Sequence, residues 1–197
     1  KLFKVKTVFD ISDFFPESVI AYFPKSHSLL SDFVYCLTQQ MMNENIRIAD
    51  ICTTCSDKLK DYVHRISPDK PVKRIPNGVD TKIFSPENYS LELREKLDLQ
   101  KENLLIYVGS IESWLDFDCV FKAMNILKKQ NFIIQLLVVG RSIYSNKLPF
   151  FPLVNKYGLS KQVKFLGYQP YEVLPKLINL CDAGLIPFKL NSPLTDM

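Results

Sequence analysis

Two kinds of apolar pattern alternate along this chain. Short, nearly unbroken apolar or β-branched runs predict strands at residues 4–11, 49–55, 72–75, 104–109, 133–140, 163–167 and 183–187. Stretches with apolar residues three or four positions apart predict helices at residues 28–48, 56–66, 91–99, 116–130, 151–157 and 171–180. Apolar strands that alternate with helices are typical of a parallel sheet covered on both faces. The expected fold class is therefore α/β.

The longest helical stretch and a sharp turn organise the first part of the chain. Residues 28–48 carry apolar side chains at recurring positions, namely Leu29, Leu30, Phe33, Leu37, Met41 and Ile48. Pro76, Asn77 and Gly78 then follow the strand predicted at residues 72–75. Proline cannot donate to a sheet ladder, and Asn-Gly readily takes positive φ, so the strand stops there and the backbone turns. Taken alone, this stretch favours an ordinary turn.

The composition is that of a globular protein. The 197 residues are 47% hydrophobic and 23% charged, which is enough to fill a core. No run reaches the roughly 18 apolar residues of a membrane-spanning helix. Five cysteines without disulfide-framework spacing suit a reducing compartment. The basic residues are dispersed, so nucleic-acid binding is not indicated, but the net charge of +4 favours an anionic ligand or an anionic membrane face.

Three predicted strands end at a glycine. Gly109, Gly140 and Gly167 occupy these equivalent positions. In an open parallel sheet, ligands bind beyond the carboxyl ends of the strands, where glycine lets the backbone approach a phosphate or a ring closely. Each glycine also serves a tight turn between strand and helix, so a ligand-binding edge and plain turns both remain open. The chain lacks a G-x-G-x-x-G sequence, which disfavours a dinucleotide site of the dehydrogenase type.

Motifs at separated sites carry a family resemblance. The segments are VFDISDFF (8–15), RIADICTTCSDKL (47–59), IPNGVDTKIFSP (75–86), VGSIESWLDFD (108–118) and VKFLGYQPYEVLPKLINLCDAGLIPFKLNSPLTDM (163–197). Together they resemble the family 4, or group 1, type of retaining glycosyltransferases with the GT-B fold, over nearly the whole chain. That resemblance implies two Rossmann-like domains, and it places the turn at Asn77-Gly78 where the chain passes from one domain to the other.

The resemblance implies a domain division and a reaction. Residues 1–80 would be the closing part of an acceptor-side domain, and residues 81–197 most of a nucleotide-sugar donor-binding domain. The chain would then be an internal fragment, inactive by itself. The intact enzyme would move a sugar from a nucleoside diphosphate sugar to an acceptor hydroxyl, with retention, in polysaccharide or glycolipid synthesis. The alternatives are a degenerate GT-B binding module without catalysis and an isomerase similar to a nucleotide-sugar 2-epimerase.

The donor-binding residues follow from the same resemblance. Gly109 and Ser110 would hold the phosphates, and Gly167 and Tyr168 would lie against the base. The loop after the last strand, lying over the sugar and phosphates of the donor, would contribute Phe188, Asn191 and Thr195. Trp114 is either a support beneath this face or a plain hydrophobic anchor.

The chain departs from the family pattern where basic residues are usual. Many relatives carry Gly-Arg after the first donor-domain strand and Lys-Gly further on, whereas this chain has Gly109-Ser110 and Trp114-Leu115-Asp116. Arg141 and Lys189 are the candidate replacements, and each is otherwise a solvated surface charge.

The remaining expectations concern cofactors, catalysis and location. The expected reaction is metal-independent and uses only the nucleoside diphosphate sugar, because backbone N–H groups at helix N-termini and a few cations can stabilise the departing diphosphate. No catalytic residue is assigned, and for Asp10 and Asp13 a capping or turn role is favoured over catalysis. The expected partners are a nucleotide-sugar donor and a saccharide or lipid-linked acceptor. The expected location is the cytoplasm, with possible peripheral contact with the membrane.

Overall fold

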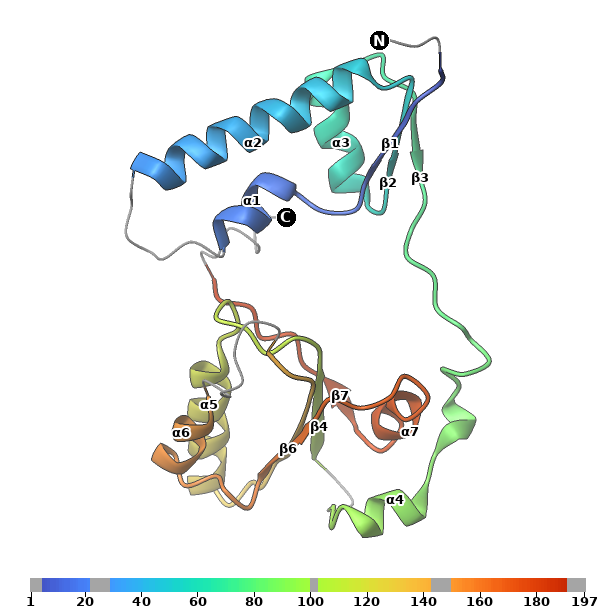
Figure 1. The fold of residues 1–197 in the computed structure, drawn as a ribbon. Coiled ribbons are helices and arrows are strands. Elements are labelled where there is room, and N and C mark those ends of the chain that lie inside the picture. Colours follow the sequence, from blue (N-terminus) through green and yellow to red (C-terminus); the bar gives the residue numbers. More distant parts are fainter. Residues whose placement is uncertain (1–4, 22–28, 100–102, 143–149, 191–197) are drawn as a thin grey trace. The chain divides into compact units, whose positions relative to one another are not determined.

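The chain folds into two compact units, each built on its own parallel sheet (Figure 1). The computed structural model describes residues 5–21, 29–99, 103–142 and 150–190. The first unit is formed by the residues up to Gly78, and the second runs from Val79 to Lys189. The change of unit thus falls at Gly78, beside the predicted turn, but residues 75–80 form no assigned turn and Gly78 has no positive φ. None of the helices in the described ranges has the length and apolarity to cross a membrane.

The first unit contains a three-stranded parallel sheet in the order β1-β2-β3. Its elements are β1 (Val8–Ile11), α1 (Phe15–Ala21), α2 (Leu29–Ile48), β2 (Ile51–Thr54), α3 (Asp57–Ile66) and β3 (Val72–Arg74). Ser56 caps α3 by accepting a hydrogen bond from the Leu59 N–H. Helix α1 was not predicted. Its start is fixed by Asp13, whose carboxylate accepts from the Phe14 N–H and the Ser18 hydroxyl.

One face of this sheet carries the core of the first unit. The strands contribute Ile11 and Cys52, and helices α2 and α3 contribute side chains such as Ile46 and Val63. The recurring apolar residues of α2 named above do not join this core. They are 46 to 91% exposed, whereas Ser31, Met42 and Ile46 are the buried residues of α2. The periodicity predicted the helix correctly, but the side of α2 that packs on the sheet is another one.

The second unit contains a four-stranded parallel sheet in the order β6-β5-β4-β7. After a 3₁₀ turn (Pro86–Asn88), its elements are α4 (Leu91–Lys96), β4 (Leu104–Val108), α5 (Phe117–Lys129), β5 (Gln135–Val139), α6 (Phe151–Lys156), β6 (Val163–Gly167), α7 (Leu174–Ile178) and β7 (Ala183–Gly184). Strands β4 and β5 pair in parallel from Leu104↔Gln135 to Val108↔Val139. The predicted α/β class and the parallel sheet are therefore confirmed.

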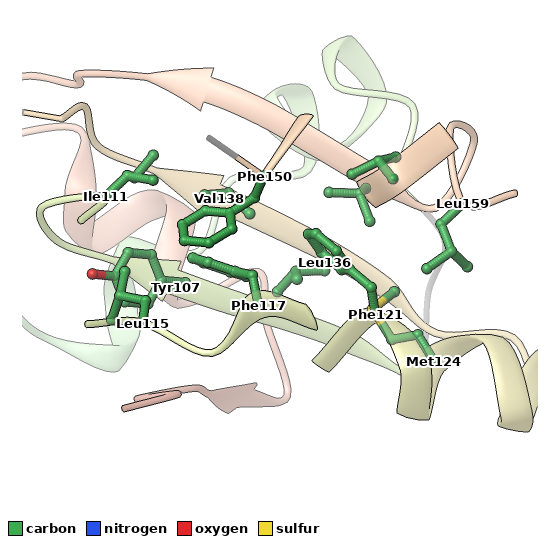
Figure 2. Packing of buried hydrophobic residues seen from close by; sticks show 12 residues of the cluster. Tyr107, Ile111, Leu115, Phe117, Phe121, Met124, Leu136, Val138, Phe150 and Leu159 are labelled. Atoms are coloured by element: carbon green, nitrogen blue, oxygen red, sulfur yellow. The ribbon is translucent and has the colours of Figure 1, made fainter. Parts of the chain in front are cut away.

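Side chains alternate along β5 between the two faces of this sheet. Leu136 and Val138 point to a core shared with α5 and α6, which includes Phe117 and Phe121 (Figure 2). Leu137 and Val139 point to the opposite core, which Leu177 of α7 helps to close. Helices cover both faces, so the strands read as unbroken apolar runs. This rigid double-sided core fixes where the strands end, and the strand ends carry the candidate site.

Some element boundaries differ from the prediction. Strand β5 begins at Gln135 rather than at Ile133, and β7 is limited to Ala183–Gly184. Among the strands of the described ranges, β7 lies at the sheet edge and pairs with β4 alone. The Leu185 N–H still donates to the Ile106 carbonyl at 2.8 Å, but beyond it the chain leaves the sheet. Apolar character alone predicts too great a length for an edge strand of this kind, since the side chains stay apolar beyond the last hydrogen bond of the sheet.

Candidate functional site

A cavity of about 300 Å³ lies at the carboxyl ends of β4, β5 and β6, within the second unit. Its lining residues come from the loops after these strands and from the start of α7: Val108, Gly109, Ser110, Val139, Gly140, Arg141, Tyr168, Gln169 and Leu174. Four of the predicted donor-binding residues, Gly109, Ser110, Arg141 and Tyr168, are thus brought together. The edge of the sheet at which the cavity lies is the one where open parallel sheets bind their ligands.

Glycine is required at the end of β5 because two backbones meet there. A Cβ atom on Gly140 would lie 1.9 Å from the carbonyl oxygen of Gly109, and the φ of Gly140 is +137°. The Gly140 N–H donates to the Gly167 carbonyl at 2.8 Å, which joins this turn to the end of β6. The strand-end glycines therefore let three loops converge on the cavity.

The Tyr107 side chain holds the loop after β4 in place. The phenolic hydroxyl of Tyr107 donates to the Ser110 carbonyl at 2.5 Å, and the ring packs edge-on against Phe117 (Figure 2). Burial, with a further contribution from the Glu112 carboxylate, raises the pKa of Tyr107 from its usual 10.0 to about 12. The hydroxyl therefore stays protonated and donates at any physiological pH. Nothing in the sequence pattern singled out Tyr107 as a support for the site.

The loops after β4 and β5 are also joined to each other. The Ile111 N–H donates to the Arg141 carbonyl at 3.1 Å. The Ser142 hydroxyl donates to the buried Glu112 carboxylate at 3.2 Å. These contacts fix the backbone that carries Ser110 and Arg141, so hydrogen bonds between the two loops hold both residues in place at the cavity.

The polar groups at the cavity suit an anion. In the described part of the chain, the Arg141 guanidinium forms no ion pair or hydrogen bond, and it lies over the Tyr168 ring with 5.4 Å between the guanidinium carbon and the ring centroid. Within the same scope, the backbone N–H of Ser110 is not hydrogen-bonded. Ser110 and Arg141 both line this cavity, and a guanidinium and a free backbone N–H are groups that bind phosphate oxygens well.

Gln169 is a lining residue that the sequence analysis missed. Its side-chain amide donates to the Leu166 carbonyl at 2.7 Å, which leaves the amide oxygen as an acceptor. Gly167 does not line the cavity itself, but its φ of +67° turns the chain at the point where Tyr168 and Gln169 enter the lining. A polar residue two positions past a strand-end glycine was the available signal for Gln169.

Two other predicted residues, Phe188 and Lys189, belong to a separate contact. Phe188 pairs with Leu115 in an antiparallel bridge, and the Lys189 N–H donates to the Trp114 carbonyl at 2.9 Å. The Lys189 ammonium group donates to the Ser113 carbonyl. These residues join the chain after β7 to the loop before α5 and do not line the cavity. A direct contact of either side chain with a donor stays a prediction.

The structure places the remaining candidates as follows. Trp114 is partly buried against the core shared with α5 and α6. Asn191 and Thr195 lie outside the described residues. Within the described ranges, no group of three His, Cys, Asp or Glu side chains could hold a metal ion.

A second cavity, of about 280 Å³, lies in the first unit between β1 and α2. Its lining includes Asp10 and Asp13 together with apolar side chains such as Phe9 and Met41. Asp13 is already engaged as the cap of α1, and Asp10 accepts a hydrogen bond from the Thr53 hydroxyl. Asp13 thus has the kind of role that the sequence favoured, whereas Asp10 lies within β1 and bonds across to β2, which is neither a cap nor a turn.

Comparisons with known proteins agree with this geometry. The sequence profile of the family described as glycosyl transferases group 1 matches residues 90–190. A comparison with curated protein sequences gives no match. Among solved structures, HepE from Anabaena in complex with UDP and glucose superposes with a TM-score of 0.65 at 18% identity, over 92% of this chain and 46% of HepE.

Two further solved structures are similar in the same way. Sucrose-phosphate synthase from Thermosynechococcus elongatus matches with a TM-score of 0.68 at 22% identity, over 95% of this chain and 47% of the synthase. WaaG, a glycosyltransferase involved in lipopolysaccharide biosynthesis, matches with a TM-score of 0.65 at 18% identity, over 94% of this chain and 51% of WaaG. The chain thus spans about half the length of these proteins. It belongs to the group 1 glycosyltransferases and has their GT-B type of Rossmann-like α/β fold.

Proposed function

We propose that this protein transfers a sugar from a nucleoside diphosphate sugar to an acceptor hydroxyl, with retention of the anomeric configuration. The observation that carries the proposal is the cavity at the carboxyl ends of β4, β5 and β6, where the Arg141 guanidinium and the Ser110 N–H make no hydrogen bond within the described ranges. Family membership supplies the reaction class. The neighbour HepE, solved with UDP and glucose, supplies a nucleotide and a sugar as the ligand types to test.

The chemistry requires positive charge where the leaving group departs. As the glycosidic bond breaks, negative charge grows on the diphosphate, and fixed donors stabilise it more effectively than water does. Arg141 is placed to supply a bidentate, permanently charged donor, and Ser110 a backbone N–H and a hydroxyl. In this proposal Arg141 replaces the basic residue that relatives carry directly after the first strand of the domain. The second unit is then the donor domain, and the first unit part of the acceptor domain.

We further propose that no metal ion takes part. The diphosphate charge would be stabilised by Arg141 and backbone N–H groups alone, so transfer by the active enzyme would continue in excess EDTA. Loss of activity in EDTA, restored by Mg²⁺ or Mn²⁺, would overturn this point while leaving the assignment of the donor site in place.

The proposal also includes an acceptor class and a location. A saccharide or lipid-linked acceptor, in polysaccharide or glycolipid synthesis, is supported by the involvement of the neighbour WaaG in lipopolysaccharide biosynthesis. A cytoplasmic protein with peripheral membrane contact agrees with the net charge of +4. Fractionation of cells that make the native protein tests this location. Recovery of a secreted protein would contradict it.

Binding and product analysis test the proposal as a whole. Titration of UDP and GDP should perturb the amide signals of Gly109, Ser110 and Arg141 in the NMR spectrum. Uridine, which lacks phosphate, should bind more weakly. If these signals do not respond at millimolar nucleotide, the donor site is assigned wrongly. For the active enzyme, an α-linked donor should give an α-linked product, and a β-linked product would exclude retention.

One alternative has an observation of its own. Ser110 and the segment 114–116 lack the basic residues that relatives use at these positions. A binding module without catalysis would therefore bind nucleotide at the same cavity and never release UDP from a donor sugar. Turnover by the intact protein decides between the two functions.

A further inference from the structure

The Arg141 and Tyr168 side chains form a pair at the cavity whose role the proposed function leaves open. The guanidinium carbon of Arg141 lies 5.4 Å from the centroid of the Tyr168 ring, and both residues line the cavity. Tyr168 is 67% exposed, so it contributes little to the core. Among the described residues, this ring contact is the interaction that holds the Arg141 side chain.

The backbone places these two residues next to each other. The Gly140 N–H donates to the Gly167 carbonyl at 2.8 Å, and Arg141 and Tyr168 are the residues that directly follow these glycines. Gly167 has a φ of +67°, which an ordinary side chain adopts only with strain. The pair is therefore built into the junction of the β5 and β6 ends and does not depend on a long flexible loop.

A cation–π contact uses the charge of the guanidinium and leaves its N–H groups unused. Arginine has five such donors in a rigid planar fork, which matches the oxygens of a phosphate. An exposed arginine without a contact samples many rotamers, and ordering it on binding lowers affinity. A ring that already holds the guanidinium at the cavity removes part of this loss before any ligand arrives.

We propose that Tyr168 is a positioning residue, which holds the Arg141 guanidinium over the cavity for the diphosphate of the donor. This inference rests on the proposed function, since it needs a phosphate-bearing ligand at this cavity. It assigns to the Tyr168 ring an action through Arg141 rather than a contact with the base. The competing role, in which the ring stacks on the base, predicts a different pattern of affinities.

A double-mutant cycle read with two ligands tests the inference. UDP and uridine are titrated into the wild-type chain and into R141Q, Y168L, Y168F and the double variant R141Q/Y168L. We expect R141Q to weaken UDP binding by about tenfold or more, the size of a lost charge-assisted hydrogen bond. Y168L should weaken UDP binding by about two- to fivefold, the size of an exposed cation–π contact. Y168F, which keeps the ring, should bind as the wild type does.

Two features of the cycle separate positioning from other roles. In the R141Q background, Y168L should cause no further loss, because the residue it positions is gone. Uridine affinity should be unchanged by Y168L, because uridine has no phosphate for Arg141 to bind. The control is Y89L, since Tyr89 forms a similar pair with Arg94 in the same unit, 5.7 Å from guanidinium carbon to ring centroid, away from the cavity lining. Y89L should leave UDP affinity unchanged.

Three other outcomes would contradict the positioning role, and one of them would also contradict the proposed function. If Y168L weakens uridine and UDP equally, and still does so in the R141Q background, the ring stacks on the base and the positioning role is wrong. If R141Q leaves UDP affinity unchanged while Gly109 and Ser110 still respond to UDP, the inference is wrong but the proposed donor site stands. If the wild-type chain does not bind UDP at all, the proposed function fails and this inference fails with it.

Discussion

At the scale of single residues, we expect even a small substitution at Gly140 to lower stability and disturb the site. Alanine there would place a methyl group 1.9 Å from the Gly109 carbonyl oxygen, at a φ of +137°. Because the obstacle is backbone, the loops must separate. We expect Gly140→Ala to lower the free energy of unfolding by about 2 kcal/mol or more and to remove the UDP-dependent shifts at Ser110.

The control for this substitution is Gly78→Ala. Gly78 has no atom within 4 Å of the added methyl group. Urea denaturation of this variant should match that of the wild type to about 0.5 kcal/mol. If Gly140→Ala unfolds at the wild-type urea concentration and still binds UDP, the close approach of the two loops is not a requirement of the site.

Cys181 gives a prediction about alkaline pH. Burial, with a contribution from the Asp182 carboxylate, raises the pKa of this thiol from its usual 9.0 to about 12, and the thiol donates to the Leu177 carbonyl at 3.2 Å. Above pH 9 the unfolded chain loses this proton, while the folded chain keeps it until about pH 12. The unfolded state therefore binds fewer protons in this window, so stability falls as the pH rises.

Chemical denaturation at a series of pH values measures this effect. Between pH 9 and 10 the stability of Cys181→Ala should fall less steeply with pH than that of the wild type. The Cys119→Ala variant is the control, because Cys119 is exposed, and its profile should follow the wild type. Identical slopes for wild type and Cys181→Ala would show that the thiol does not stay protonated in the folded state.

The sequence predicted the site residues that follow strand ends and missed those that act through contacts. Gly109 was marked because a strand end in a parallel sheet lies at the ligand edge. Ser110 followed from the family resemblance, and Arg141 was chosen as the basic residue directly after the next strand-end glycine. Tyr107 was missed because its role depends on a hydrogen bond to the Ser110 carbonyl three residues on, which no periodic pattern encodes. Lys189 was assigned by its charge alone, and only the fold brings its ammonium group to the Ser113 carbonyl.

At the scale of elements, α2 shows what periodicity predicts and what it leaves open. The recurrence of apolar residues predicted a helix, and α2 runs over Leu29–Ile48. The same recurrence did not predict that Leu30 and Phe33 would be exposed while Ser31 is buried. Periodicity reports that a helix has an apolar face, whereas the connections of the fold decide which side meets α1, α3 and the sheet. Helix α1 was missed because its seven residues are too few to show a clear helical recurrence of apolar positions.

The contact between the loop before α5 and the chain after β7 should be a local support. Lys189→Met removes the ammonium group that donates to the Ser113 carbonyl but keeps the aliphatic stem. We expect the amide hydrogens of Asp116 and Lys189, which donate to the Pro187 and Trp114 carbonyls, to exchange faster in this variant. The loss of stability should be about 0.5–1.5 kcal/mol, the net value of one hydrogen bond.

Lys122→Met, on the exposed side of α5, controls for the loss of charge. It should leave the exchange rates of both amides unchanged. The predicted direct contact of Lys189 with the donor has a different signature, since its loss would weaken UDP more than uridine. Unchanged exchange in Lys189→Met together with a selective loss of UDP affinity would favour that contact over the local support.

At the scale of the whole molecule, the alternation of apolar strands and helices was sufficient to predict an α/β chain with a parallel sheet. The prediction succeeded because both faces of the second sheet are covered, so each strand is apolar throughout and easily recognised. The Pro-Asn-Gly sequence marked the place where β3 stops and the unit changes, next to Gly78. The sharp turn predicted there is not formed: residues 75–80 have no assigned turn, and neither Asn77 nor Gly78 has a positive φ. Proline ends a strand by lacking an N–H donor, whereas Asn-Gly only permits a positive φ and does not impose one.

The last prediction concerns what residues 1–197 can do by themselves. We expect this chain to bind UDP or GDP and not to transfer sugar. The loops after β4, β5 and β6 place Arg141 and Ser110 at one cavity within the second unit, so we expect these residues to bind nucleotide in the chain as it is. Transfer additionally needs an acceptor held in line with the donor, and that proximity supplies much of the rate. The solved structures that this chain matches are about twice its length, as coverage of 46% and 47% indicates.

The two activities are separated by using one sample for both measurements. UDP titration should shift the amide signals of Gly109 and Ser110, while incubation with UDP-glucose and a panel of saccharide acceptors should release no UDP above the rate of spontaneous hydrolysis. R141Q serves as the control for binding, because it keeps the fold but removes the cation from the cavity. Acceptor-dependent release of UDP by the wild-type chain would contradict this prediction. It would show that residues 1–197 already position an acceptor. Conversely, binding that R141Q does not weaken would move the phosphate site away from the ends of β5 and β6, because no other described residue of the cavity lining carries a positive charge.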